Sequence, residues 1–243
     1  MTDDRSDLKP RSITYSRVVD LSHSIHPDMP RWPADPPVDF QAVAQISSEG
    51  YFLRRVSLGE HTGTHINAPI SFHLGGQSID ALPVQSSVAP AVLFDVARES
   101  SDSPDFLLSL EDVVAWESHH GPVPTGSIIL LNTGWHVKWG TPEEFLNLDR
   151  AGVGHFPGFG VDPVRFLLEE RGIGGIGIDT HGVDGGSDQT FSVNRLMLEQ
   201  PRVVLENLAN LDQLPATGVT LVIGALRLAG GSGSPASVLA LAP

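Results

Sequence analysis

Short apolar runs between turn residues are the feature that most limits how this chain can fold. They lie at residues 91–96, 127–131, 174–180, 203–208 and 219–228, and glycine, proline or polar residues bound each of them. Such runs are typical of buried strands. None is long enough to cross a bilayer, which needs about 20 apolar residues. The runs therefore predict the strands of a globular core and no membrane span.

Two segments carry the start signals of helices. Ser109 suits a helix N-cap, and Asp112 follows at the third helical position, as in a capping box. In residues 161–171, Asp162 is expected as the N-cap and Pro163 as the first helical residue, with a glycine as the stop. The remaining expected elements are strands at 18–22 and 52–58, a helix at 194–198, and at 142–148 either a short helix or part of a functional loop.

Length and charge limit the kinds of partner. A chain of 243 residues is the size of one domain, so we expect a flexible lead-in at 1–14 and a single domain over 15–243. The net charge of −14, without a basic stretch, argues against binding nucleic acid or an anionic membrane. The absence of cysteine excludes disulfides and thiolate chemistry. The acidic start lacks the apolar core of a signal peptide, so a cytoplasmic location is expected.

Residues 57–73, S-L-G-E-H-T-G-T-H-I-N-A-P-I-S-F-H, concentrate three histidines in a short stretch. Gly63 and Pro69 exclude one continuous helix there. Because a strand is expected just before, the histidines follow a strand end at a glycine turn, where their side chains can converge. Converging neutral imidazoles can hold a divalent metal. The alternative is a set of surface histidines, or of core histidines with their hydrogen bonds satisfied.

Two further residues stand out by their surroundings. Trp32 lies in the proline-rich loop H-S-I-H-P-D-M-P-R-W-P-A-D, where it can form a rigid wall for a planar ligand or belong to irregular surface structure. Glu206 interrupts an apolar run, although carboxylates are seldom buried without a partner. Taken alone, Glu206 would be expected to face solvent.

The string H-T-G-T-H-I-N-A-P resembles the signature of the cyclase and kynurenine-formamidase-like metal hydrolases, His-x-Gly-Thr-His-x-Asp-Ala-Pro-x-His. The matching residues are His61, Gly63, Thr64, His65, Ala68 and Pro69. Further along, G-I-D-T at 177–180 and L-E-N-L at 205–208 are also similar to the family. The resemblance implies an α/β fold in a single domain, with a mixed β-sheet or barrel-like core and peripheral helices.

Three positions depart from the family pattern. Asn67 replaces a metal-binding Asp, Ser71 replaces the general acid/base His, and Asn194 replaces a His that binds a second metal together with the Glu of L-E-N-L. The resemblance makes Glu206 a metal-facing carboxylate. An amide oxygen can coordinate a cation but cannot bridge two dications as a carboxylate does. We therefore expect one divalent ion, Zn²⁺ or Mn²⁺, held by His61, His65 and Glu206 with Asn67 as a further oxygen donor.

The resemblance implies a hydrolase of a small amide, ester or lactone, similar to an arylformamidase, because a metal polarises a carbonyl and acidifies bound water. Two alternatives stay open. The same Lewis-acid chemistry would serve a cyclase or dehydratase of a small metabolite. A chain that has lost ligands can also be a non-catalytic relative that binds a small molecule.

Roles for the remaining site residues follow from these expectations. If residues 71–73 are extended, Ser71 and His73 point to the same side. His73 would then transfer the proton while Ser71 positions substrate or water, unless His73 is simply a loop histidine. Trp32, Phe72 and Asn194 are the expected substrate-binding residues, and the aromatic side chains favour an aromatic substrate. The resemblance also implies a homodimer or homotetramer.

Overall fold

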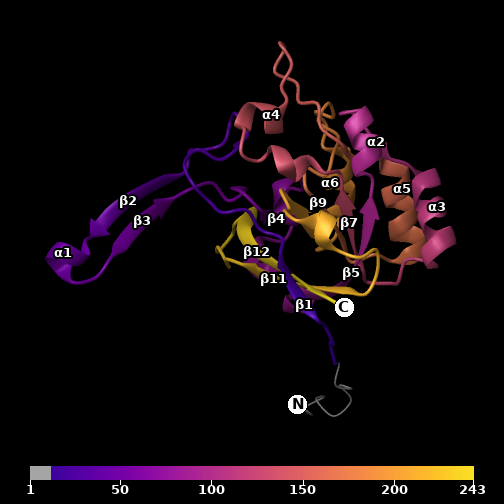
Figure 1. Ribbon diagram of the computed structural model, residues 1–243, viewed down its shortest axis with the longest axis horizontal. Coiled ribbons are helices and arrows are strands. Elements are labelled where there is room, and N and C mark those ends of the chain that lie inside the picture. The colour runs from indigo at the N-terminus through magenta and orange to yellow at the C-terminus, as the bar shows by residue number, and fades with distance from the viewer. Residues whose placement is uncertain (1–11) are drawn as a thin grey trace.

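The computed structural model describes residues 12–243, so most of the expected lead-in at 1–14 lies outside the described residues. The expected fold class is confirmed: one mixed eight-stranded sheet curls into a barrel-like core with helices outside it (Figure 1). Its spatial order is β1-β12-β11-β5-β7-β9-β10-β4, and β12 also pairs with β4, which closes the sheet. The strands are β1 (Arg17–Asp20), β4 (His65–Asn67), β5 (Val88–Asp95), β7 (Ile128–Asn132), β9 (Gly175–Ile178), β10 (Val203–Glu206), β11 (Val219–Ala225) and β12 (Gly233–Ala242).

The sheet is parallel in its centre and antiparallel at its closing seam. Strands β5, β7, β9 and β10 run parallel, whereas β4 is antiparallel to both β10 and β12. The register sets His65 of β4 opposite Glu206 of β10 and Pro235 of β12. The sequence of residues 230–235, G-G-S-G-S-P, is typical of a loop, yet β12 begins at Gly233, because β4 supplies it with a pairing partner.

Both faces of the central strands are buried, which explains their continuous apolar sequence. In β7, Ile128 and Leu130 point into the barrel interior, and Ile129 and Leu131 point toward the outer helices, because neighbouring side chains of a strand alternate between faces. The outer layer is formed by α2 (Ala97–Asp102), α3 (Leu110–His120), α5 (Val161–Phe166), continued by a π-helical turn Leu167–Arg171, and α6 (Ser192–Met197).

Helix starts were predicted with mixed success. The capping box of α3 is present, with Ser109 and Asp112 each accepting from the other's backbone N–H. In α5 the N-cap is Gly160 rather than Asp162, and Pro163 lies inside the first turn instead of at its first position. Position 160 requires glycine because the backbone passes close to β6: a Cβ there would lie 2.7 Å from the carbonyl oxygen of Leu108. Gly172 ends this helical segment in the left-handed conformation, as expected.

A β-hairpin projects from the barrel as an arm, residues 39–57 (Figure 1, left). It consists of β2 (Asp39–Ala44), α1 (Ile46–Glu49) and β3 (Leu53–Ser57), and within residues 12–243 the strands β2 and β3 pair only with each other. Strand β3 was predicted and β2 was not. Every residue of β3 is exposed, so its alternating apolar pattern does not mark a face packed on the core of the same chain.

The remaining elements are short and lie in the connections. The expected helix at 142–148 is α4 (Pro142–Leu146), and the other short elements are β6 (Leu107–Leu108), β8 (Gly158–Phe159) and 3₁₀ turns at Pro69–Ser71, Ile79–Ala81, Val84–Ser87, Trp135–Lys138 and Leu211–Gln213. Within residues 12–243, none of the helices has the length and apolar character to cross a membrane.

Candidate active site

A cavity of about 520 Å³ opens beside the closing seam of the barrel, where β4 and β10 contribute its floor. It brings together nearly all of the residues expected from the sequence. They come from segments far apart in the chain: Trp32, His61, His65, Asn67, Ser71, Phe72, Asn194 and Glu206. His73 is missing from the lining, although it follows Phe72 directly.

His65 and Glu206 meet because their strands place them opposite each other. The Nδ1–H of His65 donates to the carbonyl of Gly63 at 2.9 Å, so Nε2 is the nitrogen that faces the carboxylate. Nε2 lies 3.0 Å from Oε2 of Glu206. Gly63 has a φ of 64°, a conformation that glycine adopts without strain, and this turn carries the chain into β4.

The amide groups of Asn194 and Asn67 are oriented by the carboxylates around them. The Nδ2 group of Asn194 donates to Asp184 at 2.9 Å and to Glu206 at 3.0 Å, which leaves its Oδ1 as an acceptor. Nδ2 of Asn67 donates to this Oδ1 at 3.1 Å. The Oδ1 atom of Asn67 must therefore point the other way, toward His61.

His61 is held by a second chain of hydrogen bonds. The hydroxyl of Ser232 donates to the carboxylate of Glu60 at 2.6 Å, so it can only accept from the ring. The Nε2 atom of His61, 2.9 Å from that hydroxyl, is therefore the nitrogen that carries the proton. The other nitrogen, Nδ1, is left with a lone pair and lies 2.9 Å from Oδ1 of Asn67.

The cavity floor thus holds two pairs of acceptor atoms, and within each pair the two atoms face each other. One pair is Nδ1 of His61 and Oδ1 of Asn67; the other is Nε2 of His65 and Oε2 of Glu206. Each pair needs either an extra proton or a cation. Neighbouring ligands of one ion, bound at 2.0–2.2 Å, lie about 3 Å apart at the right angles of octahedral coordination and about 3.4 Å apart at tetrahedral angles, so both pairs match the octahedral spacing more closely.

The atoms that the floor offers to a divalent ion are therefore these two pairs, and they include the amide oxygen of Asn67. Among the residues that the structure describes, no three His, Cys, Asp or Glu side chains cluster closely enough to hold a metal by themselves. Asn194, whose amide nitrogen is directed at the carboxylates, presents only Oδ1, and Asn67 occupies that oxygen.

Burial sets the charge of the floor. Burial and the neighbouring imidazole of His65 lower the pKa of His61, which keeps its ring neutral. Burial by itself would raise the pKa of Glu206, but the adjacent ring of His65 and the hydrogen bond donated by Asn194 outweigh it and hold this pKa below its usual range. Burial raises the pKa of Asp184 to about 6. The floor thus combines a neutral imidazole at His61 with an ionised carboxylate at Glu206.

Ser71 and His73 differ in position. Pro69–Ser71 forms a 3₁₀ turn, so the extended geometry considered for residues 71–73 is absent and the two side chains diverge. Ser71 lines the cavity and its hydroxyl donates to the backbone carbonyl of Ser232. His73 turns outward, and its Nε2–H donates to the carbonyl of Arg195 at 2.8 Å. The structure does not bring His73 to the cavity.

His181 is a lining residue that the sequence reasoning did not single out. Its ring stacks on Trp32, with ring centroids 5.1 Å apart and planes 16° apart, and its buried Nδ1 has no hydrogen-bond partner within the described part of the chain. Burial lowers the pKa of His181 to about 4, so the ring is neutral at neutral pH. The signal was its position in a polar turn directly after the strand expected at 174–180, where ligand-binding residues often lie.

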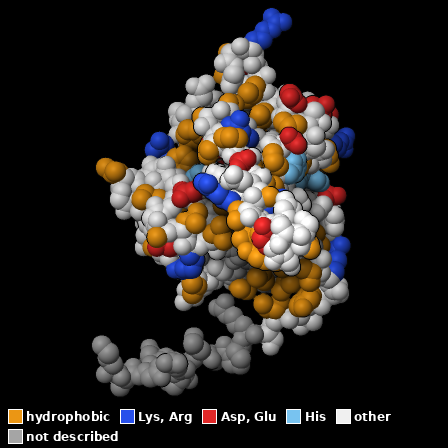
Figure 2. All heavy atoms as spheres, turned by 90° about the vertical axis from the view of Figure 1, so that its left-hand side faces the viewer, with side chains coloured by type: hydrophobic (Ala, Val, Ile, Leu, Met, Phe, Trp, Pro, Cys, Tyr) orange, Lys and Arg blue, Asp and Glu red, His pale blue; other side chains and the backbone are white. Residues whose placement is uncertain are grey.

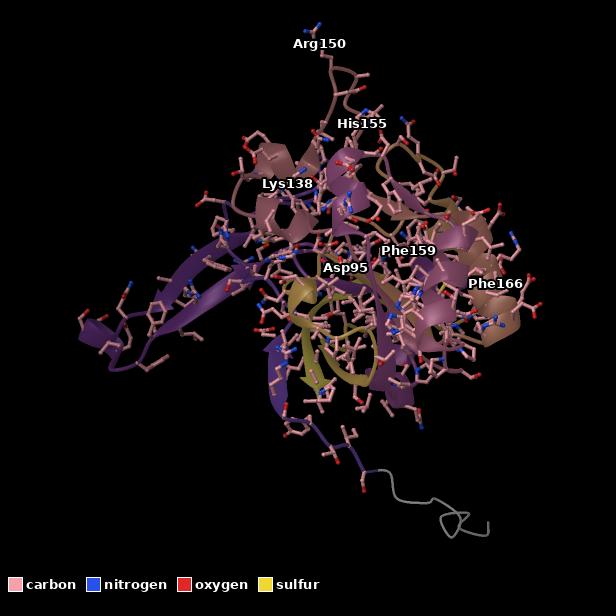
Figure 3. The ribbon with its side chains drawn as sticks, turned by 45° about the vertical axis from the view of Figure 1, so that its right-hand side comes forward. Asp95, Lys138, Arg150, His155, Phe159 and Phe166 are labelled. Atoms are coloured by element: carbon pink, nitrogen blue, oxygen red, sulfur yellow. The ribbon has the colours of Figure 1, made fainter. Side chains whose placement is uncertain are left out.

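The far wall of the cavity comes from the long region between β7 and α5. This region contains residues 142–148, for which the sequence left open a short helix or part of a functional loop. Residues 152–154 and Phe156 line the cavity from this side. His155 lies at the base of the projecting turn, which carries Arg150 at its tip (Figure 3). With Trp32, Phe72 and Phe191, Phe156 makes the walls aromatic above a polar floor.

Comparisons with known proteins agree with this architecture. The family model described as Putative cyclase matches residues 19–185. An isatin hydrolase of Roseibium aggregatum is 35% identical, covering 93% of this chain and 92% of its own, and a kynurenine formamidase of Bacillus cereus is 28% identical, covering 90% and 95%. A solved isatin hydrolase bound to the product analogue thioisatinate is 33% identical, with a TM-score of 0.86 over 93% of this chain and 92% of that one. The chain belongs to the cyclase family, which the histidine motif had indicated.

Proposed function

We propose that this protein is a metal-dependent hydrolase that opens the amide bond of a small aromatic molecule, with esters and lactones as related substrates. The observation that carries the proposal is that two pairs of acceptor atoms, each pair face to face, lie at the floor of an aromatic cavity. His61, His65, Asn67 and Glu206 would hold one ion, Zn²⁺ or Mn²⁺. When bound, such an ion polarises a carbonyl and makes water more acidic. The relatives named isatin hydrolase and kynurenine formamidase support this reaction class.

The charge of the cavity favours an uncharged substrate. No lysine or arginine belongs to its lining among residues 12–243, whereas Asp35, Asp184, Asp188 and Glu206 do. A carboxylate-bearing substrate would find no cationic side chain there to pair with. Amide hydrolysis of a neutral ring produces a carboxylate, which the acidic lining would repel and so help to release. An uncharged aromatic cyclic amide therefore fits better than an amino-acid substrate.

The protein's own residues supply orientation and a dry site. Trp32 and Phe72 flank the space where an aromatic ring can lie, and stacking fixes its plane. Since its hydroxyl proton is committed to the carbonyl of Ser232, Ser71 offers the cavity only lone pairs. Of the histidines lining the cavity, His181 alone is outside the proposed ligand set. Its neutral imidazole can accept a hydrogen bond from the attacking water or from a polar group of the substrate.

Metal content and turnover test this proposal together. The protein is stripped with a chelator, titrated with Zn²⁺ or Mn²⁺, and assayed for ring opening of isatin by absorbance. We expect about one ion per chain, no turnover without it, and loss of both in His61→Ala with an unchanged circular dichroism spectrum. His120→Ala, on the outer surface of α3, is the matched control and should retain metal and activity.

The other results would separate the alternatives. Two tightly bound ions per chain would contradict the single-ion site. A folded protein that binds aromatic ligands but no metal would contradict the hydrolase and favour a non-catalytic binding protein. Metal binding with cyclisation or dehydration instead of hydrolysis would keep the site and change the reaction.

We also propose that the protein assembles as a homodimer or homotetramer through its arm. A lone two-stranded hairpin is at best marginally stable in water. In this arm, more than half of the surface of each of five apolar residues is nevertheless exposed: Val43, Ile46, Tyr51, Phe52 and Val56. Figure 2 looks at the molecule from the arm's side and shows hydrophobic side chains gathered on that face. A second copy of the chain that covers these side chains would stabilise the hairpin.

A further inference from the structure

We propose that Glu60 and Ser232 are positioning residues that fix the tautomer of His61, so that its Nδ1 atom presents a lone pair toward Asn67. The role of His61 as a metal ligand rests on the proposed function, whereas the assignment of its tautomer does not. A histidine can bind a cation only through an unprotonated nitrogen, and the partner of the other nitrogen decides which one is free.

The assignment follows from the number of protons available to three side chains. Glu60 accepts twice at Oε2, from the backbone N–H of Ser232 at 2.7 Å and from its hydroxyl at 2.6 Å. The hydroxyl has one proton, which is then committed to Glu60. Ser232 can therefore only accept from His61, and the ring proton must be on Nε2.

The loop that carries Ser232 is shaped around the ring of His61. A Cβ on Gly233 would lie 2.7 Å from Cε1 and 3.0 Å from Nδ1 of that ring, and a Cβ on Gly231 would lie 2.8 Å from Oε1 of Glu60. Glycine on both sides of Ser232 thus lets the backbone approach the ring and the carboxylate closely. These close approaches explain why glycine occupies both positions in the loop sequence G-G-S-G-S-P, which turn propensity alone does not explain.

The two histidines of the floor are held in opposite tautomers by different devices. A backbone carbonyl, that of Gly63, holds the proton of His65 on Nδ1. A pair of side chains holds the proton of His61 on Nε2. Only the second device can be removed by substituting side chains outside the ligand set, so the tautomer of His61 can be tested without touching a ligand.

Long-range ¹H–¹⁵N correlation spectra of the metal-free protein, with ¹⁵N-labelled histidine, report the tautomer directly. We expect His61 in the Nε2–H form in the unsubstituted chain and in Ser232→Thr, which keeps the hydroxyl. In Ser232→Ala, the Nε2–H form loses its acceptor, and the proton should move to Nδ1, where it can bond to Asn67. In Glu60→Ala, the freed hydroxyl can donate to Nε2, with the same result. Affinity for Zn²⁺, measured by chelator competition, should then fall about 10- to 100-fold.

Asp80→Ala is the matched control. Asp80 accepts from the N–H of Gly230 at 3.0 Å, so it anchors the same loop without contacting His61. If Asp80→Ala changed the tautomer of His61 as much as Ser232→Ala and Glu60→Ala do, Glu60 and Ser232 would act only by holding the loop, and the proposal would be overturned. So would an Nδ1–H form in the unsubstituted protein, or an unchanged tautomer in Ser232→Ala. If the tautomer responds as expected while no variant binds metal, the positioning role stands and the metal-dependent function is wrong.

Discussion

At the scale of single residues, two asparagines decide the chemistry of the cavity floor. A carboxylate accepts hydrogen bonds on both oxygens, whereas an amide has one donor end and one acceptor end. The Nδ2 group of Asn194 donates to Glu206 and Asp184, so its Oδ1 is an acceptor. The Nδ2 group of Asn67 therefore donates to this Oδ1. The acceptor end of Asn67 is thereby aimed at His61. Replacing either amide changes both the charge of the floor and the direction of its lone pairs.

Asn67→Asp should tighten cation binding. The added charge attracts a dication, although the bond donated to Asn194 is lost. We expect affinity for Zn²⁺ or Mn²⁺ to rise about tenfold in Asn67→Asp and to fall by at least as much in Asn67→Leu, which has a similar volume and no oxygen. Calorimetric titration of the metal-free proteins measures both. Equal affinities in the two variants would show that the side chain at this position does not face the ion.

His181→Phe separates stacking from hydrogen bonding at the cavity wall. Phenylalanine keeps an aromatic face against Trp32 but has no ring nitrogen. We expect kcat to fall about 10²- to 10⁴-fold, the range for a lost proton-transfer group, with metal content and KM nearly unchanged. Steady-state kinetics and elemental analysis are the measurements, and His73→Ala is the comparison, because His73 lies outside the cavity lining. A larger loss in His73→Ala than in His181→Phe would restore the role first predicted for His73.

At the scale of elements, the sequence predicted what local rules govern. Apolar runs marked the strands β5, β7, β9, β10 and β11, and the capping box marked α3. The motif placed His61, His65 and Asn67 together, since they are neighbours in the chain. His181 and the Glu60–Ser232 contact were not predicted, because they depend on which strands become neighbours in the closed sheet. The arm was not predicted, because the alternation of apolar and polar residues in β3 indicates a strand but does not indicate which surface packs on it.

The turn at 147–157 is an element whose anchoring should depend on pH. His155 lies 2.9 Å from both carboxylate oxygens of Asp105, and its Nε2 lies 3.7 Å from Asp149. The hydrogen bond with Asp105 raises the pKa of His155 above its usual 6.5. A raised pKa in the folded state means that the stabilisation is complete below about pH 6.5 and is lost as the pH rises through the folded value. This turn should therefore be held more firmly in mild acid.

Amide hydrogen exchange, corrected for intrinsic rates, tests this anchoring. We expect protection of residues 149–154 to decrease between pH 6 and pH 8 in the unsubstituted chain. His155→Gln should show the weaker protection at both values, since its side chain does not titrate. A pH dependence that survives in His155→Gln would assign the effect to another group.

At the scale of the whole molecule, the arm leaves an apolar surface that the chain itself does not cover. Among the described residues, β2 and β3 form ladders with each other alone, and Tyr51, Phe52 and Val56 are each more than 50% exposed. An exposed hairpin with such side chains is liable to pair with other chains. In a closed homo-oligomer, the arms of equivalent subunits can cover one another's apolar side chains. The net charge of −14 opposes association at long range, so the contact must rest on apolar burial.

Charged substitutions in the arm should therefore dissociate the assembly without unfolding the barrel. In Val43→Asp/Phe52→Asp, a carboxylate would have to be desolvated at each contact, which costs far more than the apolar burial gained there. We expect light scattering after gel filtration to give a dimer or tetramer for the unsubstituted chain and a monomer for the double variant at the same concentration. Val114→Asp is the control, because Val114 is 54% exposed on α3, on the opposite side of the molecule from the arm (Figure 1). It should leave the mass unchanged. A monomeric unsubstituted protein, or a double variant that stays assembled, would show that the arm is not the contact between subunits.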